Sequence, residues 1–393
     1  MGQRRPALPE DVQQLTGLIR TGKVFALQDW IRAGKRYRSQ DIGDDRVSIL
    51  YLATEMGVHS VLEVLLEAGG WKGEELGDAL DWALNSRRAD LAELLFSHGA
   101  KLSELDFETV CRTMDFGLME RFLREGGDPS RDNAFARALR AMKARPLLRF
   151  FKTFRSEFPT LDDQAALALC DAVANDQVRW TALLAWAGAD PFRPVPWDFD
   201  TPFPVGAEDG TTAATRATWR CNAEILKVLK LRPNADQAIE LMSDAMSSGN
   251  IEFFRAVLAQ VPADRINASA RDSSEPLEQA VRRWGHRDLW SNSPTTKSDD
   301  ETLRCIQLLL DRGARWNPDP GQMRQIRRPL LEHEPRYIVQ LLRLLLYTPG
   351  AAERASVLLL CDSSGLRKKI AEADPPLLRE IKILRQDLRK ATA

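Results

Sequence analysis

A pair of short amphipathic helices separated by a glycine, within residues 48–70, most constrains how this chain can fold. Apolar residues recur between Val61 and Leu66 at the spacing of one helix face. Gly57 separates the two helices and Gly69 ends the second, because glycine adopts the left-handed backbone of a helix end without a Cβ penalty. Two helices this short cannot bury both apolar faces alone. The segment must therefore stack against similar neighbours, as in a repeat protein.

The spacing of glycines indicates that such neighbours exist. Gly22 and Gly34 are twelve positions apart, as are the two glycines of the 48–70 segment. Gly126 and Gly188 are 62 positions apart, which is two repeats of 31, so the divergent segment between them keeps the register. The periodicity predicts an all-α solenoid of about ten helix-turn-helix repeats.

The first helix of the 48–70 segment carries a recognisable residue pattern: Ser48, Ile49, Leu50, Tyr51, Ala53 and Thr54. With the glycines at 57 and 69, this pattern resembles the ankyrin repeat. The repeat's Thr-Pro-Leu-His motif is never intact, and Glu275-Pro276-Leu277 comes closest to it. The resemblance implies noncatalytic recognition of another protein through a concave groove lined by finger loops and first helices.

The pattern divides the chain into four parts. We predict N-terminal ankyrin-like repeats over 1–191, a finger insertion over 192–210, further repeats over 211–350 with an insertion near 285–300, and capping helices over 351–393. Four prolines in 192–210 preclude a regular helix there. The last helix, about 375–390, is interpreted as a cap because terminal repeats need a polar outer face. As a binding helix it would meet an acidic partner.

The resemblance also indicates candidate partner-binding residues. In ankyrin repeats the two variable residues before the inter-helix glycine project into the groove. Carried onto this chain, those positions include Glu55, Arg112, Trp219 and Arg220. Trp219 and Arg220 are the sharpest pair, because tryptophan and arginine dominate interface hot spots. The alternative is that Trp219 packs against a neighbouring repeat.

The 192–210 insertion adds two aromatic candidates, Trp197 and Phe199. The insertion has no obvious core of its own, so these rings either fold back on the solenoid or meet a partner. Asp198 and Asp200 could bind a divalent cation, but carboxylates in a proline-rich loop are typical of solvated turns, and we predict no metal site. A different class of function, an enzyme or ligand-binding protein, would require a site built by the 192–210 and 285–300 insertions.

Charge balance narrows the class of partner. Lys plus Arg is 55 and Asp plus Glu is 56, so a general nucleic-acid role has no bulk electrostatic support. A basic C-terminal face, with Arg324, Arg327, Arg328 and residues 367–369, leaves nucleic-acid binding as an alternative. No apolar run reaches the roughly 18 residues of a membrane span. We predict a protein partner and no membrane.

The remaining features favour a cytoplasmic, noncatalytic protein. Five cysteines are scattered without a C-x-x-C pair, as expected of reduced thiols that fill small core sites. The sequence contains no nucleophile, phosphate-loop or metalloprotease motif, so we predict no enzyme activity and no cofactor. Degenerate motifs with many Arg and Trp residues are more typical of a bacterial ankyrin protein, such as a toxin-immunity, defence-system or effector protein.

Overall fold

A computed structural model describes most of the chain: residues 10–35, 37, 48–196, 198–200, 210–248, 250–267, 276–285, 299–316, 326–327, 330–331 and 333–392. Within these residues the regular structure is helical, and β-type pairing is limited to isolated bridge residues, such as Trp316 with Ala352. The predicted all-α repeat fold is confirmed.

The chain divides into two compact units. Unit 1 comprises Met1–Ala168, Trp186–Asp190 and Val195–Gly210, and unit 2 comprises Leu169–Ala185, Pro191–Pro194 and Thr211–Ala393. The boundary runs through helices α11 (Thr160–Ala174) and α12 (Val178–Ala187).

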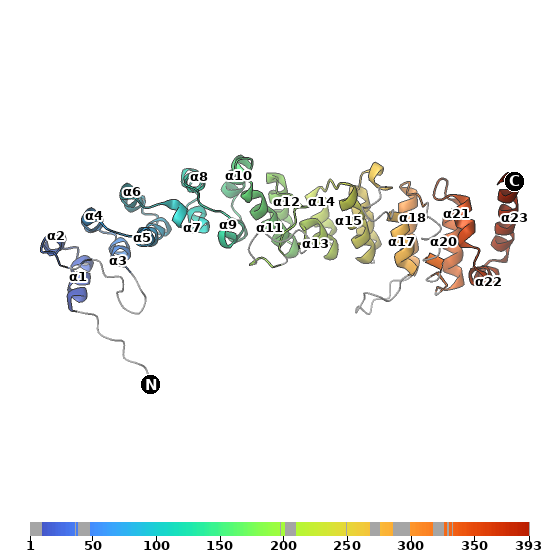
Figure 1. Ribbon diagram of the computed structural model, residues 1–393, viewed down its shortest axis with the longest axis horizontal. Coiled ribbons are helices and arrows are strands. Elements are labelled where there is room, and N and C mark those ends of the chain that lie inside the picture. Colours follow the sequence, from blue (N-terminus) through green and yellow to red (C-terminus); the bar gives the residue numbers. More distant parts are fainter. Residues whose placement is uncertain are drawn as a thin grey trace, which may run out of the picture. The chain divides into compact units, whose positions relative to one another are not determined.

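Unit 1 is a stack of helix pairs, seen in blue to green in Figure 1. The pairs are α1 (Glu10–Arg20) with α2 (Val24–Arg32), α3 (Ile49–Met56) with α4 (His59–Ala68), α5 (Gly73–Asn85) with α6 (Ala89–Ser97), α7 (Phe107–Arg112) with α8 (Phe116–Arg124), and α9 (Ala134–Met142) with α10 (Arg145–Phe154). The first helices α1, α3, α5, α7 and α9 contact one another in order, and α2, α4 and α6 form a second row. Each pair therefore buries its apolar faces against the next pair, as its short helices require.

A left-handed residue ends the first helix in most of these pairs. Gly57 has φ of 69°, and the later pairs of unit 1 place Arg87, Met114 and Lys143 at φ of 56°, 57° and 47°. Arg87 stands where the sequence pattern has the inter-helix glycine, and it adopts the left-handed backbone of that glycine. Left-handed geometry costs a residue with a Cβ about 1–2 kcal/mol. The left-handed backbone of the turn is thus retained in the pairs that have no glycine there.

Phenylalanine rings form the core of the divergent region between α7 and α10. The Phe107 ring centroid lies 4.5 Å from that of Phe122, 5.7 Å from that of Phe135 and 6.1 Å from that of Phe150. All four side chains are buried. Aromatic burial of this size compensates for the lost repeat motif, because each ring removes a large apolar area from water.

Unit 2 repeats the arrangement with less regular pairs (Figure 1). Its helices after α12 are α13 (Ala213–Trp219), α14 (Ala223–Leu229), α15 (Ala235–Ser248), α16 (Ile251–Gln260), α17 (Pro276–Gly285), α18 (Asp299–Asp311), α20 (Pro335–Tyr347), α21 (Arg354–Leu360), α22 (Ser364–Ala373) and α23 (Pro375–Thr392). Helices α13, α15 and α17 contact in order, as do α14, α16 and α18.

The sequence pattern predicts closing helices at 351–361 and 375–390, and the structure adds α22 between them. Helix α22 buries only two apolar side chains, Leu366 and Ile370. Leu377 and Ile381 of α23 are buried, as the interpretation of that helix as a cap requires. The predicted insertion near 285–300 lies outside the described residues except at its two ends. The four-part division of the chain stays a prediction.

Arginine side chains connect neighbouring turns in both units. In unit 1, Arg131 Nη2 donates to the carbonyl of Leu105 at 2.6 Å. In unit 2, Arg385 Nη2 donates to the carbonyl of Leu358 at 2.8 Å. The last carbonyls of a helix have no partner inside the helix, and charged donors satisfy them well. This use explains part of the high arginine content.

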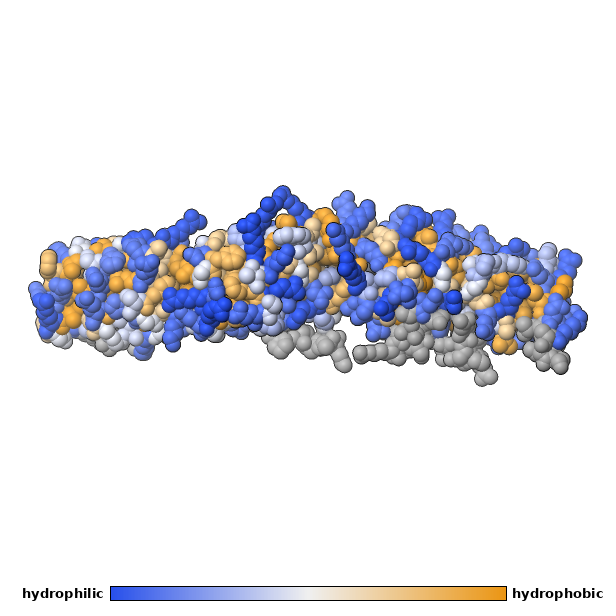
Figure 2. Space-filling model, turned by 90° about the horizontal axis from the view of Figure 1, so that it is seen from above, coloured by the Kyte–Doolittle hydropathy of each residue, from blue (hydrophilic) through white to orange (hydrophobic). Residues whose placement is uncertain are grey.

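Polar and apolar residues are interspersed on the face seen in Figure 2. In the described part of the chain, no helix has the length and apolar character needed to cross a membrane.

Candidate functional site

Helices α3 and α5 present a concentration of carboxylates, which we call the acidic face: Glu55, Glu74, Glu75, Asp78 and Asp81. Glu55 is exposed near the end of α3, and Asp78 is exposed in the middle of α5. The two helices are packed against each other. The acidic face therefore spans two neighbouring first helices, which are the elements that line the groove in the ankyrin resemblance.

Electrostatic shifts show that these groups lie close together. Burial raises the pKa of the Tyr51 hydroxyl on α3. The negative charges of Glu55, Asp81 and Asp78 raise that pKa further, so all three carboxylates lie near one tyrosine.

The carboxylates of α5 also repel one another. Partial burial raises the pKa of Asp78, and the charges of Glu74, Asp81 and Glu75 add to that increase. Like charges three or four positions apart on a helix destabilise it by about 0.2–0.5 kcal/mol per pair. Among the described residues, no Lys, Arg or His forms an ion pair with the acidic face. Repulsion among these carboxylates lowers the stability of the fold, and their combined negative charge attracts a cation.

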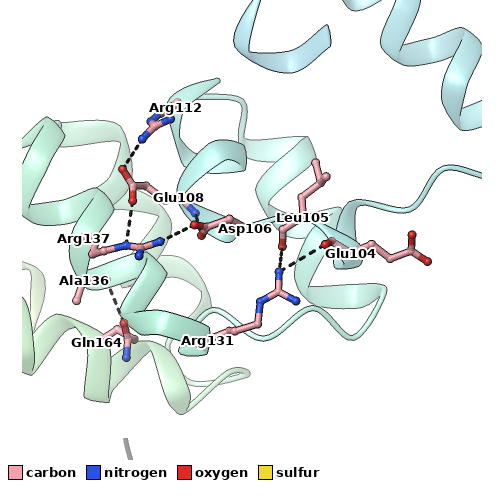
Figure 3. Close-up of polar contacts among 9 residues, drawn as sticks. All are labelled: Glu104, Leu105, Asp106, Glu108, Arg112, Arg131, Ala136, Arg137 and Gln164. Atoms are coloured by element: carbon pink, nitrogen blue, oxygen red, sulfur yellow. Dashed lines mark hydrogen bonds and ion pairs between the residues drawn. The ribbon is translucent and has the colours of Figure 1, made fainter. Parts of the chain in front are cut away.

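Arginines of α7 and of the following helix α9 neutralise the carboxylates of the next repeat, as Figure 3 shows. Arg112 of α7 pairs with Glu108, with 2.7 Å between Nη2 and Oε1. Glu108 also pairs with Arg137 of α9, whose Nη2 lies 2.5 Å from Asp106 Oδ2. The predicted partner-binding residue Arg112 is exposed, but its charge is already engaged within its own helix.

A segment of the 192–210 insertion lies against α9. Asn133 Nδ2 donates to the carbonyl of Phe199 at 2.8 Å, and the Arg140 guanidinium carbon lies 3.9 Å from the Phe199 ring centroid. Phe199 is half-buried by these contacts. This part of the insertion therefore folds back on the solenoid, which is one of the two possibilities that the sequence left open. Trp197, the other aromatic candidate, lies outside the described residues.

Trp219 and Arg220, the two predicted partner-binding residues of unit 2, have different surroundings. Trp219 is half exposed, with 50% of its surface accessible. Arg220 Nη2 lies 2.9 Å from Asp176 Oδ2, and Asn222 Nδ2 donates to Asp176 Oδ1 at 2.8 Å. Hydrogen bonds from Asn222 and Arg220 lower the pKa of Asp176. Arg220 therefore bridges two turns of the stack, whereas Trp219 offers exposed aromatic surface.

The described part of the basic C-terminal cluster has structural partners. Arg327 donates to the carbonyl of Leu359, Arg367 Nη2 to that of Asp362 at 3.1 Å, and Lys369 Nζ to that of His333 at 2.5 Å. Arg324 and Arg328 lie outside the described residues. Arg327, Arg367 and Lys369 are therefore engaged by backbone carbonyls of the chain itself.

A hollow of about 730 Å³ lies between α16 and α18 of unit 2. Its lining includes Glu252, Arg255, Glu301 and Arg304, and Arg255 pairs with Glu252 at 3.0 Å. Small-molecule sites are usually enclosed and mostly apolar, which this mixed-charge hollow is not. Within the described ranges, no group of three or more His, Cys, Asp or Glu could hold a metal ion.

Local sequence reasoning missed Asp78, Asp81, Asn133 and Arg140. The spacing of Glu74, Asp78 and Asp81 along one helix could have revealed the acidic face. The contact of Asn133 with Phe199 spans 66 positions and leaves no local signal.

Comparisons with known proteins give limited help. No family model matches the chain, and no curated protein matches it. Among solved structures, the human ASB11 ankyrin repeat domain aligns at 15% identity over 74% of this chain and 96% of its own, with a TM-score of 0.23. A circular tandem repeat protein with novel repeat topology aligns at 15% identity over 96% of this chain and 77% of its own, with a TM-score of 0.13. Both scores are too low to carry an argument, so the function is inferred from the residues themselves.

Proposed function

We propose that this chain is a noncatalytic, ankyrin-type repeat protein whose acidic face binds a basic segment of another protein. One observation carries the proposal: carboxylates of the first helices α3 and α5, with Glu55 and Asp78 exposed, gather without a cationic partner among the described residues. A cationic segment would relieve their mutual repulsion. Complementary charge also steers association and selects against acidic partners.

Glu55 is the predicted partner-binding residue that belongs to this surface. It lies beside Met56, which is 39% exposed, so a bound segment would meet an apolar contact next to the carboxylates. Trp219 is proposed as a separate contact point in unit 2, because half-exposed tryptophan provides large contact area at a small ordering cost.

The state of the cysteines supports the noncatalytic part of the proposal. All five lie among the described residues and form no disulfide there, and four of them are buried. Burial raises the pKa of Cys170 and Cys361 to about 12, so neither is a thiolate at neutral pH. Since the thiolate is the nucleophilic form, these residues are packing groups. A cytoplasmic role in toxin immunity, defence or host targeting stays part of the proposal.

Photo-crosslinking from defined positions tests where a partner binds. A photoreactive amino acid is placed at Met56 on α3, and in a matched variant at Glu63 on α4, which is also exposed. The proteins are mixed with extract of the cells that produce the chain, and crosslinked peptides are identified by mass spectrometry. We expect crosslinks from position 56 to a lysine- or arginine-rich segment and few from position 63. Equal crosslinking from both positions, or crosslinks to acidic segments, would contradict the proposal.

A further inference from the structure

We infer that Asn133 and Arg140 form a second binding site, for an extended peptide with an aromatic side chain, and that residues 198–200 of the same chain occupy it. We call it the α9 site. It lies apart from the acidic face and does not depend on the function proposed for that face. The kind of peptide that the site would bind is inferred from residues 198–200, which occupy it.

The α9 site binds its occupant through a buried amide. Asn133 is 1% exposed, and its Nδ2 donates to the Phe199 carbonyl at 2.8 Å. Its Oδ1 accepts from Gln164 Nε2 at 3.2 Å, and Gln164 Oε1 accepts from the amide of Ala136 at 3.1 Å. Gln164 is fully buried. This relay fixes the orientation of the Asn133 amide, so the donor faces the bound carbonyl before any segment arrives.

The backbone at the site is held in an uncommon conformation. Asp132 and Asn133 both have positive φ, 52° and 53°, immediately before α9. Two successive non-glycine residues in this region are strained and persist only where surrounding contacts determine them. In this conformation Asn133 Nδ2 lies within hydrogen-bond distance of the Phe199 carbonyl.

The aromatic ring is recognised by a cation. The Arg140 guanidinium carbon lies 3.9 Å from the Phe199 ring centroid, within the range of a cation–π contact. Arg140 is exposed, as are Asp198 and Asp200 on either side of Phe199. The occupant is therefore held by one ring and one carbonyl. A peptide from another molecule can present both groups in the same way.

Occupation by the chain itself determines how the site would behave. A peptide from another molecule must compete with the tethered segment for the site. Its apparent association constant is therefore the intrinsic constant multiplied by the fraction of time that the site is vacant. The intact chain should bind such a peptide weakly. Removal of the Phe199 ring should free the site and strengthen binding.

The test uses the full chain and a fluorescein-labelled peptide with the sequence of residues 195–204, titrated by fluorescence anisotropy. The variants are Phe199→Ala, Phe199→Ala with Arg140→Ala, and Phe199→Ala with Arg149→Ala as a control on an exposed arginine of α10. A second peptide carries alanine in place of the phenylalanine that corresponds to Phe199. Thermal unfolding verifies that each variant is folded.

We expect Phe199→Ala to bind the peptide about tenfold or more tightly than the wild type does, because the competing ring is gone. The Arg140→Ala combination should lose this gain, the Arg149→Ala control should keep it, and the alanine peptide should not bind. Equal affinity of wild type and Phe199→Ala, or binding unaffected by Arg140→Ala, would mean that the segment is only a structural brace. Phe199→Leu, which keeps an apolar side chain, replaces Phe199→Ala if the latter is unfolded. The acidic face is unchanged in all variants, so failure here leaves its proposed function intact.

Discussion

Arg88 donates a hydrogen bond from Nη2 to the carbonyl of Gly57, 31 positions earlier, at 3.1 Å. The same Nη2 lies 2.7 Å from Asp90 Oδ2. The turn between α5 and α6 is thus tied to the turn between α3 and α4. A Cβ at position 57 would lie 2.7 Å from Arg88 Nη1, and Gly57 has φ of 69°. Glycine adopts this backbone without a Cβ penalty, and a Cβ at position 57 would displace the Arg88 guanidinium from the Gly57 carbonyl.

Gly57→Ala should therefore destabilise unit 1 by about 1–2 kcal/mol, the cost of left-handed geometry for a residue with a Cβ. Gly17→Ala is the matched control, because a Cβ there meets nothing within 4 Å and α1 gains helix propensity. Urea unfolding monitored by circular dichroism compares the two. A Gly57→Ala variant as stable as Gly17→Ala would refute the role assigned to this turn.

The Arg88–Asp90 pair predicts a specific titration. The hydrogen bond from Arg88 lowers the pKa of Asp90 from 3.8 to about 2. Because the folded-state pKa is below the unfolded value, the stabilising contribution is present above pH 3.8 and is lost as the pH falls through about 2. NMR titration of the Asp90 carboxyl should give a midpoint near 2, and Arg88→Ala should move it back toward 3.8. An unchanged midpoint would show that Arg88 does not engage Asp90 in solution.

Asp78→Asn should stabilise the fold, because the charge that it removes is repelled by neighbouring carboxylates. Burial and neighbouring carboxylates raise the pKa of Asp78, so its contribution to stability falls as the pH rises through the interval just above 3.8. Neutralising it removes the like-charge pairs with Glu74, Glu75 and Asp81, each costing about 0.2–0.5 kcal/mol. We expect a higher urea midpoint at neutral pH, compared with Glu93→Gln on α6 as an exposed control. A lower midpoint for Asp78→Asn would indicate a cationic partner within the chain.

Asn133→Ala should be among the more damaging polar substitutions in unit 1. It leaves the amide of the buried Gln164 without its partner, and an unsatisfied buried polar group costs about 1–3 kcal/mol. Asn175→Ala is the control, because Asn175 is exposed and bonds only to the nearby Asp171. Denaturant unfolding should rank Asn133→Ala well below Asn175→Ala. Similar stabilities would mean that the relay is solvated.

The helix pairs could be predicted from the sequence because their signals are local. The apolar spacing and glycines of 48–70 correspond to α3 and α4 within a few residues. The left-handed turns at Met114 and Lys143 could not be predicted from the sequence. Neighbouring repeats impose this backbone conformation, and the residue types methionine and lysine do not indicate it. Helix α22 was missed because it has only two buried apolar residues.

The candidate sites were predicted less completely. Glu55 was placed on a first helix, but a net charge near zero concealed the carboxylates beside it. Trp219 and Arg220 were treated as one unit, whereas Arg220 pairs with Asp176 and Trp219 is half exposed. The two should therefore be substituted separately in binding experiments. Long-range contacts such as Asn133 with Phe199 depend on tertiary packing and leave no pattern in the chain.

Neutralising the acidic face tests the central claim most directly. A short fluorescein-labelled peptide of alternating lysine and serine is titrated into the wild type, into Glu55→Gln/Asp78→Asn/Asp81→Asn, and into a charge-matched control, Glu63→Gln/Glu67→Gln/Glu93→Gln, on the second helices. We predict about tenfold or more loss of affinity, equivalent to about 1.4 kcal/mol, for the acidic-face variant and little change for the control. Added salt should weaken wild-type binding. Equal affinity of the two variants would contradict the account, because the peptide would then respond to net charge alone.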